Sequence, residues 1–212
     1  MLQEITGLFK LATAGRDIGR LTHEFEMQED GVRSRADLEA FLRREPQFDA
    51  NGLIRYLITS GWAVELATGV SRPHGDLDII LMNKTDRREK DRVSGTYGVD
   101  VLTAKTNWVG MESSNTFLLA NAIFTNAPGY KGEKTLVVHP ATILAQKLGY
   151  YDPRLRDEDL KDVDTILRYL ARLPDKEAFY NVFYETLLRM PAVSGLQVQD
   201  RLLAMRSREI LH

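Results

Sequence analysis

The chain has 212 residues, of which 43% are hydrophobic, so it can bury a core and is too apolar for a disordered chain. Its 28 basic and 30 acidic residues give a net charge of -2, which excludes a uniform positive field for non-specific nucleic-acid binding. The absence of cysteine excludes disulfides, thiolate zinc sites and thiol nucleophiles.

The first part of the chain is predicted to be helical. Residues 1–49 carry apolar residues at roughly helical spacing and include an expected helix over Arg35 to Arg44. The apolar positions 53, 54, 57 and 58 fit a short helix that stops at Ser60-Gly61, and a second short helix is expected over 62–68. Residues 1–20 lack the apolar region of a signal peptide, and no apolar run reaches about 18 residues, so we expect a soluble, cytoplasmic protein.

After residue 76 the spacing of apolar residues changes from one typical of helices to one typical of strands. Leu77 to Met82 is a nearly continuous apolar run, typical of a buried strand, and Tyr97 to Thr103 fits a second strand. The charged stretch 83–92 joins them. Phe117 to Phe124 fits either a strand or a helix, and Thr135 to Val138 is a short strand.

The last third is predicted to be helical. Pro140 suits the first position of a helix through Leu148, and further helices are expected over about 157–173, 175–190 and 195–210. The pattern indicates an α+β fold, with a small mixed sheet covered by helices on one face. We expect three parts: an N-terminal helical segment (1–49), a core (50–138) and a helical C-terminal domain (139–212).

Two aspartates precede the apolar run. Because side chains alternate along a strand, Asp76 and Asp78 would share one face, with Cα atoms about 6.7 Å apart. Adjacent carboxylates need a positive neutraliser, and oxygen ligands suit Mg²⁺ or Mn²⁺. For Asp-x-Asp alone, a solvated turn is the commoner structure. Asp100 would join the cluster if its strand pairs beside the first, and three carboxylates can hold two divalent ions.

Other polar residues are candidates for the same site. Ser60 and Gly61 would let a polyphosphate approach the N–H groups of the following helix. Asp162 and Asp164 flank the apolar stripe of their helix on opposite sides, so spacing cannot choose between them as an active-site carboxylate. Arg72 and Lys147 could bind phosphate, and each also fits an ordinary loop or surface position. His74 and His139 each lack a second metal ligand at useful spacing, so we expect turn or helix-cap roles.

The order of these features resembles one family. Gly61-Trp-Ala-Val-Glu-Leu-Ala-Thr-Gly69 followed by Arg72-Pro-His-Gly-Asp-Leu-Asp-Ile79 is similar to the signature of the polymerase-β-like nucleotidyltransferases. The similarity is closest to the branch with the lincosamide and aminoglycoside nucleotidyltransferases and the abortive-infection toxins. Ser60 stands where that signature usually has its first glycine. Lys147 followed by Arg156-x4-Lys161-Asp162-x-Asp164 resembles a lysine and an Arg-Lys-Asp segment of the abortive-infection branch.

The resemblance implies a nucleotidyltransferase fold, with Mg²⁺ or Mn²⁺ as cofactor and a nucleoside triphosphate as substrate. It assigns metal binding to Asp76, Asp78 and Asp100, and the triphosphate loop to Ser60 with Gly61. Arg72 and Lys147 would be nucleotide-binding, and Asp162 or Asp164 would be a further catalytic carboxylate.

The implied reaction moves a nucleoside monophosphate to an acceptor hydroxyl and releases pyrophosphate. Three interpretations stay open: an enzyme that modifies a small hydroxylated molecule such as an antibiotic, a toxin that modifies tRNA or a protein and has an antitoxin partner, and a catalytically silent binding module. An acidic cleft would favour the first. The second would be favoured by a basic face near the site, built from Arg87, Arg88, Lys90, Arg92, Arg154 and Arg156.

Overall fold

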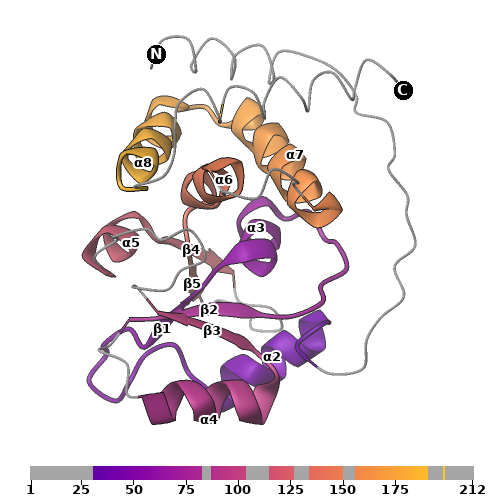
Figure 1. The fold of residues 1–212 in the computed structure, drawn as a ribbon, viewed down its shortest axis with the longest axis vertical. Coiled ribbons are helices and arrows are strands. Elements are labelled where there is room, and N and C mark those ends of the chain that lie inside the picture. The colour runs from indigo at the N-terminus through magenta and orange to yellow at the C-terminus, as the bar shows by residue number, and fades with distance from the viewer. Residues whose placement is uncertain are drawn as a thin grey trace.

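The computed structural model describes residues 31–82, 87–103, 115–126, 134–149, 156–190 and 198. Within them a mixed sheet has the order β3-β2-β1-β5-β4 (Figure 1). Its strands are β1 (Tyr56–Ile58), β2 (Asp78–Leu81), β3 (Asp100–Thr103), β4 (Ile123–Asn126) and β5 (Lys134–Val137). β2 pairs antiparallel with β1 and parallel with β3, and β5 pairs parallel with β1 and antiparallel with β4.

Seven helices occur in the described part of the chain: α2 (Arg35–Arg44), α3 (Ser60–Thr68), α4 (Arg87–Tyr97), α5 (Asn115–Asn121), α6 (Pro140–Gly149), α7 (Asp157–Arg172) and α8 (Glu177–Leu188). The predicted α+β class and the helical C-terminal region are confirmed. The helices expected before residue 31 and over 195–210, apart from Val198, lie outside the described residues. None of the described helices is both long and apolar enough to cross a membrane.

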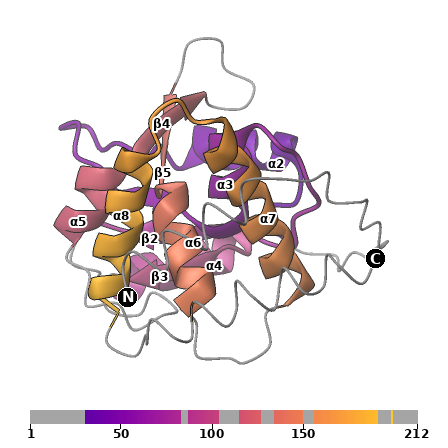
Figure 2. The same cartoon turned by 90° about the horizontal axis from the view of Figure 1, so that it is seen from above.

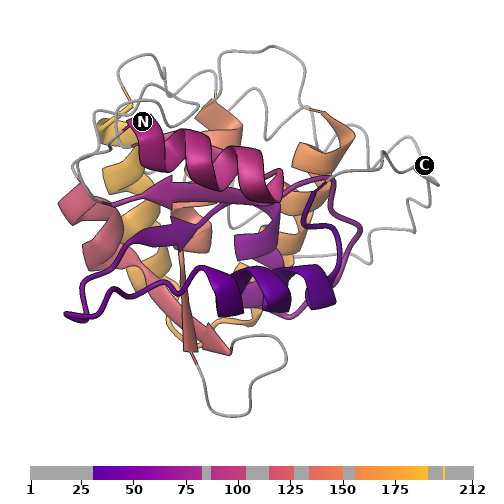
Figure 3. The same cartoon turned by 90° about the horizontal axis from the view of Figure 1, so that it is seen from below.

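The helices lie on both faces of the sheet, so the prediction of one covered face is wrong. In Figure 1, α2 and α4 lie below the sheet and α3, α6, α7 and α8 lie above it. Figure 3 shows the α2/α4 face from below, and Figure 2 shows α6, α7 and α8 from above. The physical reason is that Ile79, Ile80 and Leu81 of β2 are all buried, so both faces of this strand need apolar cover.

Two local predictions are wrong, and the structure resolves a third segment whose pattern fits either a strand or a helix. Residues 56–58 form the central strand β1 and not a helix; all three are buried, and a short apolar run does not distinguish the two structures. The charged stretch after β2 contributes to α4, which extends to Tyr97, so β3 begins only at Asp100. The ambiguous segment 117–124 contains both structures, since α5 ends at Asn121 and β4 begins at Ile123.

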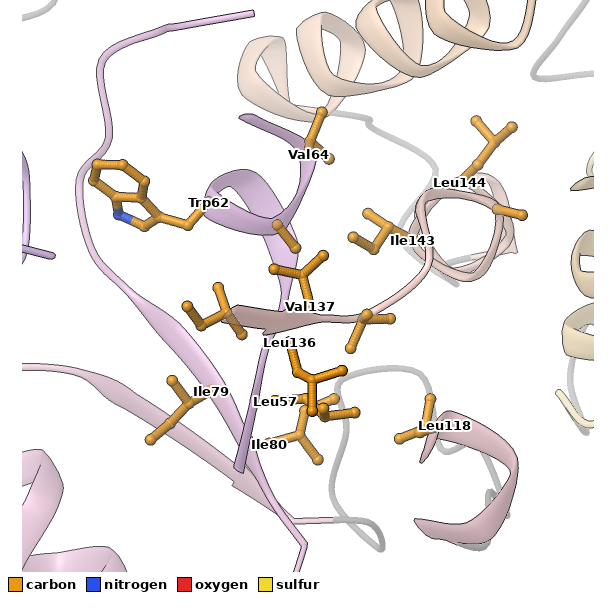
Figure 4. Close-up of a cluster of buried hydrophobic side chains, with 14 of the residues drawn as sticks. Leu57, Trp62, Val64, Ile79, Ile80, Leu118, Leu136, Val137, Ile143 and Leu144 are labelled. Atoms are coloured by element: carbon orange, nitrogen blue, oxygen red, sulfur yellow. The ribbon is translucent and has the colours of Figure 1, made fainter. Parts of the chain in front are cut away.

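The core lies on both faces of the sheet, since Leu38 and Phe41 of α2 and Val93 of α4 belong to the same buried cluster as the side chains under the upper helices. Figure 4 shows Leu57 and Ile80 of the sheet below Val137, with Val64 of α3 and Ile143 of α6 on its other side. The same apolar cluster continues into α7 and α8 through Val163, Ile166, Leu170, Phe179 and Phe183. The apolar core therefore crosses the expected boundary at 138/139.

The buried side chain of Gln47 supports the centre of the sheet. β1 and β5 are paired only at Ile58 and Val137. Beside that pair, Gln47 Nε2 donates to the Leu136 carbonyl at 2.7 Å, and its Oε1 accepts from the Leu136 amide at 2.7 Å. The Gln47 side-chain amide thus bonds both backbone groups of Leu136 on the side of β5 that faces β1.

We predict that Gln47→Leu lowers the free energy of unfolding by about 2–4 kcal/mol, because the Leu136 amide and the carbonyls of Leu136 and Tyr56 each lose a buried hydrogen bond to Gln47. Urea denaturation of the variant and the wild type measures the loss. A loss below about 0.5 kcal/mol would show that other groups satisfy Leu136.

Candidate metal centre

The sheet topology brings three carboxylates together. β1 ends where β2 and β3 begin, and the Thr59 amide donates to the Asp78 carbonyl at 3.0 Å across this junction. The parallel register of β2 and β3 sets Asp78 opposite Asp100. One carboxylate oxygen from each of Asp76, Asp78 and Asp100 lies within 4.8 Å of the others. The expectation that Asp100 joins the aspartate pair is therefore confirmed.

Burial and crowding of the carboxylates raise the pKa values of two of them. Burial and the adjacent Asp76 carboxylate raise the pKa of Asp78 to about 7, and Asp100 adds to this rise. Burial and Asp100 also raise the pKa of Asp76. Three hard oxygen donors, of which Asp76 and Asp78 have raised pKa values, form a donor set that fits a divalent cation such as Mg²⁺ or Mn²⁺. The chemistry of the residues present thus fits the implied metal.

Ser60 lies directly behind the aspartates, at the junction of β1 and α3 and not between two helices as predicted. Its backbone has φ 54°, a left-handed conformation that costs a non-glycine residue about 1–2 kcal/mol. Its side chain hydrogen-bonds the Asp78 carboxylate, which opposes the rise in the pKa of Asp78. Ser60 therefore contacts the carboxylate cluster itself.

Gly61 allows a close approach by Arg72. A Cβ atom at residue 61 would lie 1.9 Å from Arg72 Nη2 and 3.3 Å from His74 Nδ1. Arg72 pairs with Asp162 of α7, with 2.7 Å between Nε and Oδ1 and 3.0 Å between Nη2 and Oδ2. The structure thus shows Gly61 and Arg72 packed together, with Arg72 paired to a carboxylate.

Lys147 of α6 is buried, with 2% of its side chain exposed, so the surface alternative does not hold. Its Nζ lies 2.9 Å from Asp162 Oδ2 and 2.5 Å from Asp159 Oδ1, and its positive charge lowers the pKa of Asp78. Arg156 pairs with Asp159 at 3.0 Å and opposes the rise in the pKa of Asp76. These side chains form a charge network between the carboxylate cluster and helices α6 and α7.

The two candidate carboxylates of α7, Asp162 and Asp164, differ in the residues that they contact. Asp162 is fully buried and contacts Arg72 and Lys147, whereas Asp164 pairs with Arg168 on its own helix at 2.9 Å. The structure brings Asp162 into the network and does not bring Asp164 there.

Sequence reasoning missed Glu65, which is buried on α3. Its Oε2 accepts from His74 Nε2 at 2.8 Å and from the Arg72 amide at 3.1 Å, and its Oε1 accepts from Arg35 at 2.7 Å. The available signal was that Glu65 is the single charged residue in the otherwise apolar segment Ser60–Thr68. A lone charge in an apolar helix requires buried partners.

The two histidines form hydrogen bonds with protein groups. His74 is buried in the turn before Asp76, and burial lowers its pKa despite the bond to Glu65. His139 Nδ1 accepts from the Ala141 amide at 3.1 Å at the start of α6, and burial lowers the pKa of His139 to about 4. Both match the expected turn and cap roles.

No protein-family model matches this chain, and no curated protein matches it significantly. The case for the site therefore depends on the residues and their geometry.

We predict that, in a metal-chelating buffer, Asp78→Asn is more stable than the wild type at pH 8. The raised pKa of Asp78 means that the folded state keeps a proton that the unfolded chain releases above about pH 4, so wild-type stability falls between about pH 4 and pH 7. Asparagine avoids this loss, and a gain of about 1 kcal/mol would raise the melting temperature by about 3 °C.

Thermal unfolding at pH 5 and pH 8 tests this prediction. The increase in melting temperature of Asp78→Asn over the wild type should be larger at pH 8 than at pH 5. Added Mg²⁺ should stabilise the wild type more than the variant. An asparagine variant that is less stable than the wild type at pH 8 would contradict it.

We also predict that Asp162→Ala lowers the free energy of unfolding by about 3–5 kcal/mol, because it leaves the half-buried Arg72 and the buried Lys147 without this partner. Asp164→Ala removes only a partly exposed pair within one helix and should cost at most about 0.5 kcal/mol. Urea denaturation compares the two, and equal losses would refute the distinction between them.

Proposed function

We propose that this protein is a metal-dependent nucleotidyltransferase, which moves a nucleoside monophosphate from a nucleoside triphosphate to an acceptor hydroxyl. The observation that carries the proposal is the carboxylate cluster, with oxygens of Asp76, Asp78 and Asp100 within 4.8 Å at the ends of adjacent strands. Residues from separate chain segments converge there beside the start of a helix, which is the arrangement that the resemblance implies.

Asp76, Asp78 and Asp100 would hold Mg²⁺ or Mn²⁺. When bound, such ions neutralise phosphate charge and favour the ionised form of the acceptor hydroxyl. The start of α3 supports a phosphate site beside them, because the cap residue Thr59 makes no side-chain hydrogen bond to the helix. The first N–H groups of a helix favour an anion when no side chain caps them.

Positive charge near the cluster supports the same substrate. Lys147 acts electrostatically on Asp78, and Arg156, with a side chain that is 68% exposed, acts on Asp76. Arg72 also acts on Asp76 from the loop that precedes it. These cations would attract the triphosphate and balance its negative charge.

In the proposed reaction the acceptor oxygen attacks the α-phosphorus, the bond between the α-phosphorus and the bridging oxygen breaks, and pyrophosphate leaves. The hydroxyl proton would pass to one of the exposed carboxylates, Asp76 or Asp100. Asp162 is a weaker candidate for this role because its two oxygens face Arg72 and Lys147.

The acceptor is proposed to be a small hydroxylated molecule, with tRNA or a protein as the alternative. Of the basic residues that would favour tRNA, Arg92 pairs with Glu45 and belongs to α4, below the sheet in Figure 1. Arg156 lies next to the cluster. Arg154 and the side chain of Arg87 lie outside the described part of the chain.

We predict that the protein transfers label from an α-³²P-labelled nucleoside triphosphate in the presence of Mg²⁺. The four nucleotides are tested against hydroxylated antibiotics and against total RNA, so that the same assay compares the two acceptor classes. Asp76→Ala and Asp78→Ala should lower transfer by at least about a hundredfold, since each removes a ligand of the catalytic ion.

Glu185→Ala serves as the control because Glu185 is exposed on α8. It should retain wild-type transfer. Transfer that survives both aspartate substitutions would refute the proposed role of the cluster.

A further inference from the structure

The segment that carries Asp76 has no regular structure of its own. Residues 70–77 connect the end of α3 to β2 and contain neither helix nor strand. Asp76 is exposed near the end of this loop. Its position relative to Asp78 and Asp100 must therefore depend on contacts that hold the loop.

Glu65 makes the contacts that attach this loop to α3. One of its oxygens accepts from the Arg72 amide at 3.1 Å and from His74 Nε2 at 2.8 Å, so a single buried carboxylate binds the loop at two points. The other oxygen pairs with Arg35 of α2 at 2.7 Å. Charge-assisted hydrogen bonds of this kind are stronger than neutral ones.

Further contacts fix the orientation of the loop relative to Glu65. The His74 ring stacks on Trp62 of α3, with centroids 3.8 Å apart and planes inclined by 15°. α3 also begins at Ser60, which hydrogen-bonds Asp78. One helix therefore contacts Asp78 through its first residue and the segment before Asp76 through Trp62 and Glu65.

We propose that Glu65 is a positioning residue of the metal centre, which holds the loop of residues 70–77 so that Asp76 faces Asp78 and Asp100. Glu65 touches neither metal nor substrate in this role and acts through Arg72 and His74. The proposal rests on the proposed metal site, and it adds to that site a buried residue to which the resemblance assigns no role.

The loss of Glu65 has a defined structural consequence. The Arg72 amide and His74 Nε2 would lose their acceptor, and such groups restore hydrogen bonding by moving toward water. Movement of the loop would separate Asp76 from the other two carboxylates. Metal sites are sensitive to this, because loss of an outer-shell partner typically weakens metal binding about 10- to 100-fold.

The chain offers a matched control in Glu45. It is also a buried glutamate, and it pairs with Arg92 at 2.6 Å and Arg55 at 3.0 Å. It lies at the end of α2, and its partners belong to α4 and to the residue before β1. Glu45→Ala therefore removes a comparable buried charge without touching the loop of residues 70–77.

The test measures Mn²⁺ binding by electron paramagnetic resonance in the wild type, Glu65→Ala and Glu45→Ala. We predict at least tenfold weaker Mn²⁺ binding for Glu65→Ala and a change within twofold for Glu45→Ala. Hydrogen exchange of residues 70–77 should accelerate only in Glu65→Ala, because the Arg72 amide is protected by Glu65. If Glu65→Ala does not fold, Glu65→Gln replaces it in the test. We then expect Mn²⁺ binding to weaken about threefold or more, because the glutamine amide keeps the volume and one acceptor oxygen but loses the charge.

The outcomes separate the two proposals. Mn²⁺ binding that is unchanged in the Glu65 variant, with no faster exchange in residues 70–77, overturns the role of Glu65 and leaves the metal site intact. A wild type that does not bind Mn²⁺ overturns the metal site, and with it this inference. Equal losses of affinity in the Glu65 and Glu45 variants also overturn it, because they would report general destabilisation.

Discussion

Repulsion among three carboxylates is the constraint on which the rest of the site depends. The register of β2 and β3 fixes Asp78 opposite Asp100, and Asp76 lies on the loop directly before β2. Ionising Asp78, which is partly buried beside Asp76 and Asp100, is costly, and its pKa of about 7 reflects that cost.

The surroundings reduce this cost without removing it. The Ser60 hydroxyl and the charge of Lys147 lower the pKa of Asp78 from the level that burial would set, and Arg156 does the same for Asp76. Lys147 and Arg156 are in turn paired with Asp159. The cations are thus partly neutralised by their own carboxylates, which leaves the cluster open to an additional positive charge.

This arrangement gives the C-terminal helices a role beyond core packing. α6 and α7 cover α3 with apolar side chains and also place Lys147 and Asp162 in the charge network. Buried ion pairs contribute little net stability but constrain geometry, because a displaced partner leaves a buried charge. Asp162 therefore links α7 to Arg72 in the loop of residues 70–77 that leads to the carboxylate cluster, and Glu65 links α3 to the same loop.

Local sequence patterns by themselves determined the carboxylate pair, the helix Arg35–Arg44 and the helical C-terminal region, because strand alternation and helix caps act within a few residues. They misassigned residues 56–58, whose strand forms only between β2 and β5. Tertiary structure alone decided that Asp162, and not Asp164, meets Arg72, that Lys147 is buried, and that Glu65 holds the loop. Periodicity gives the direction of a side chain relative to its own helix or strand, whereas the partner it meets there comes from a distant segment.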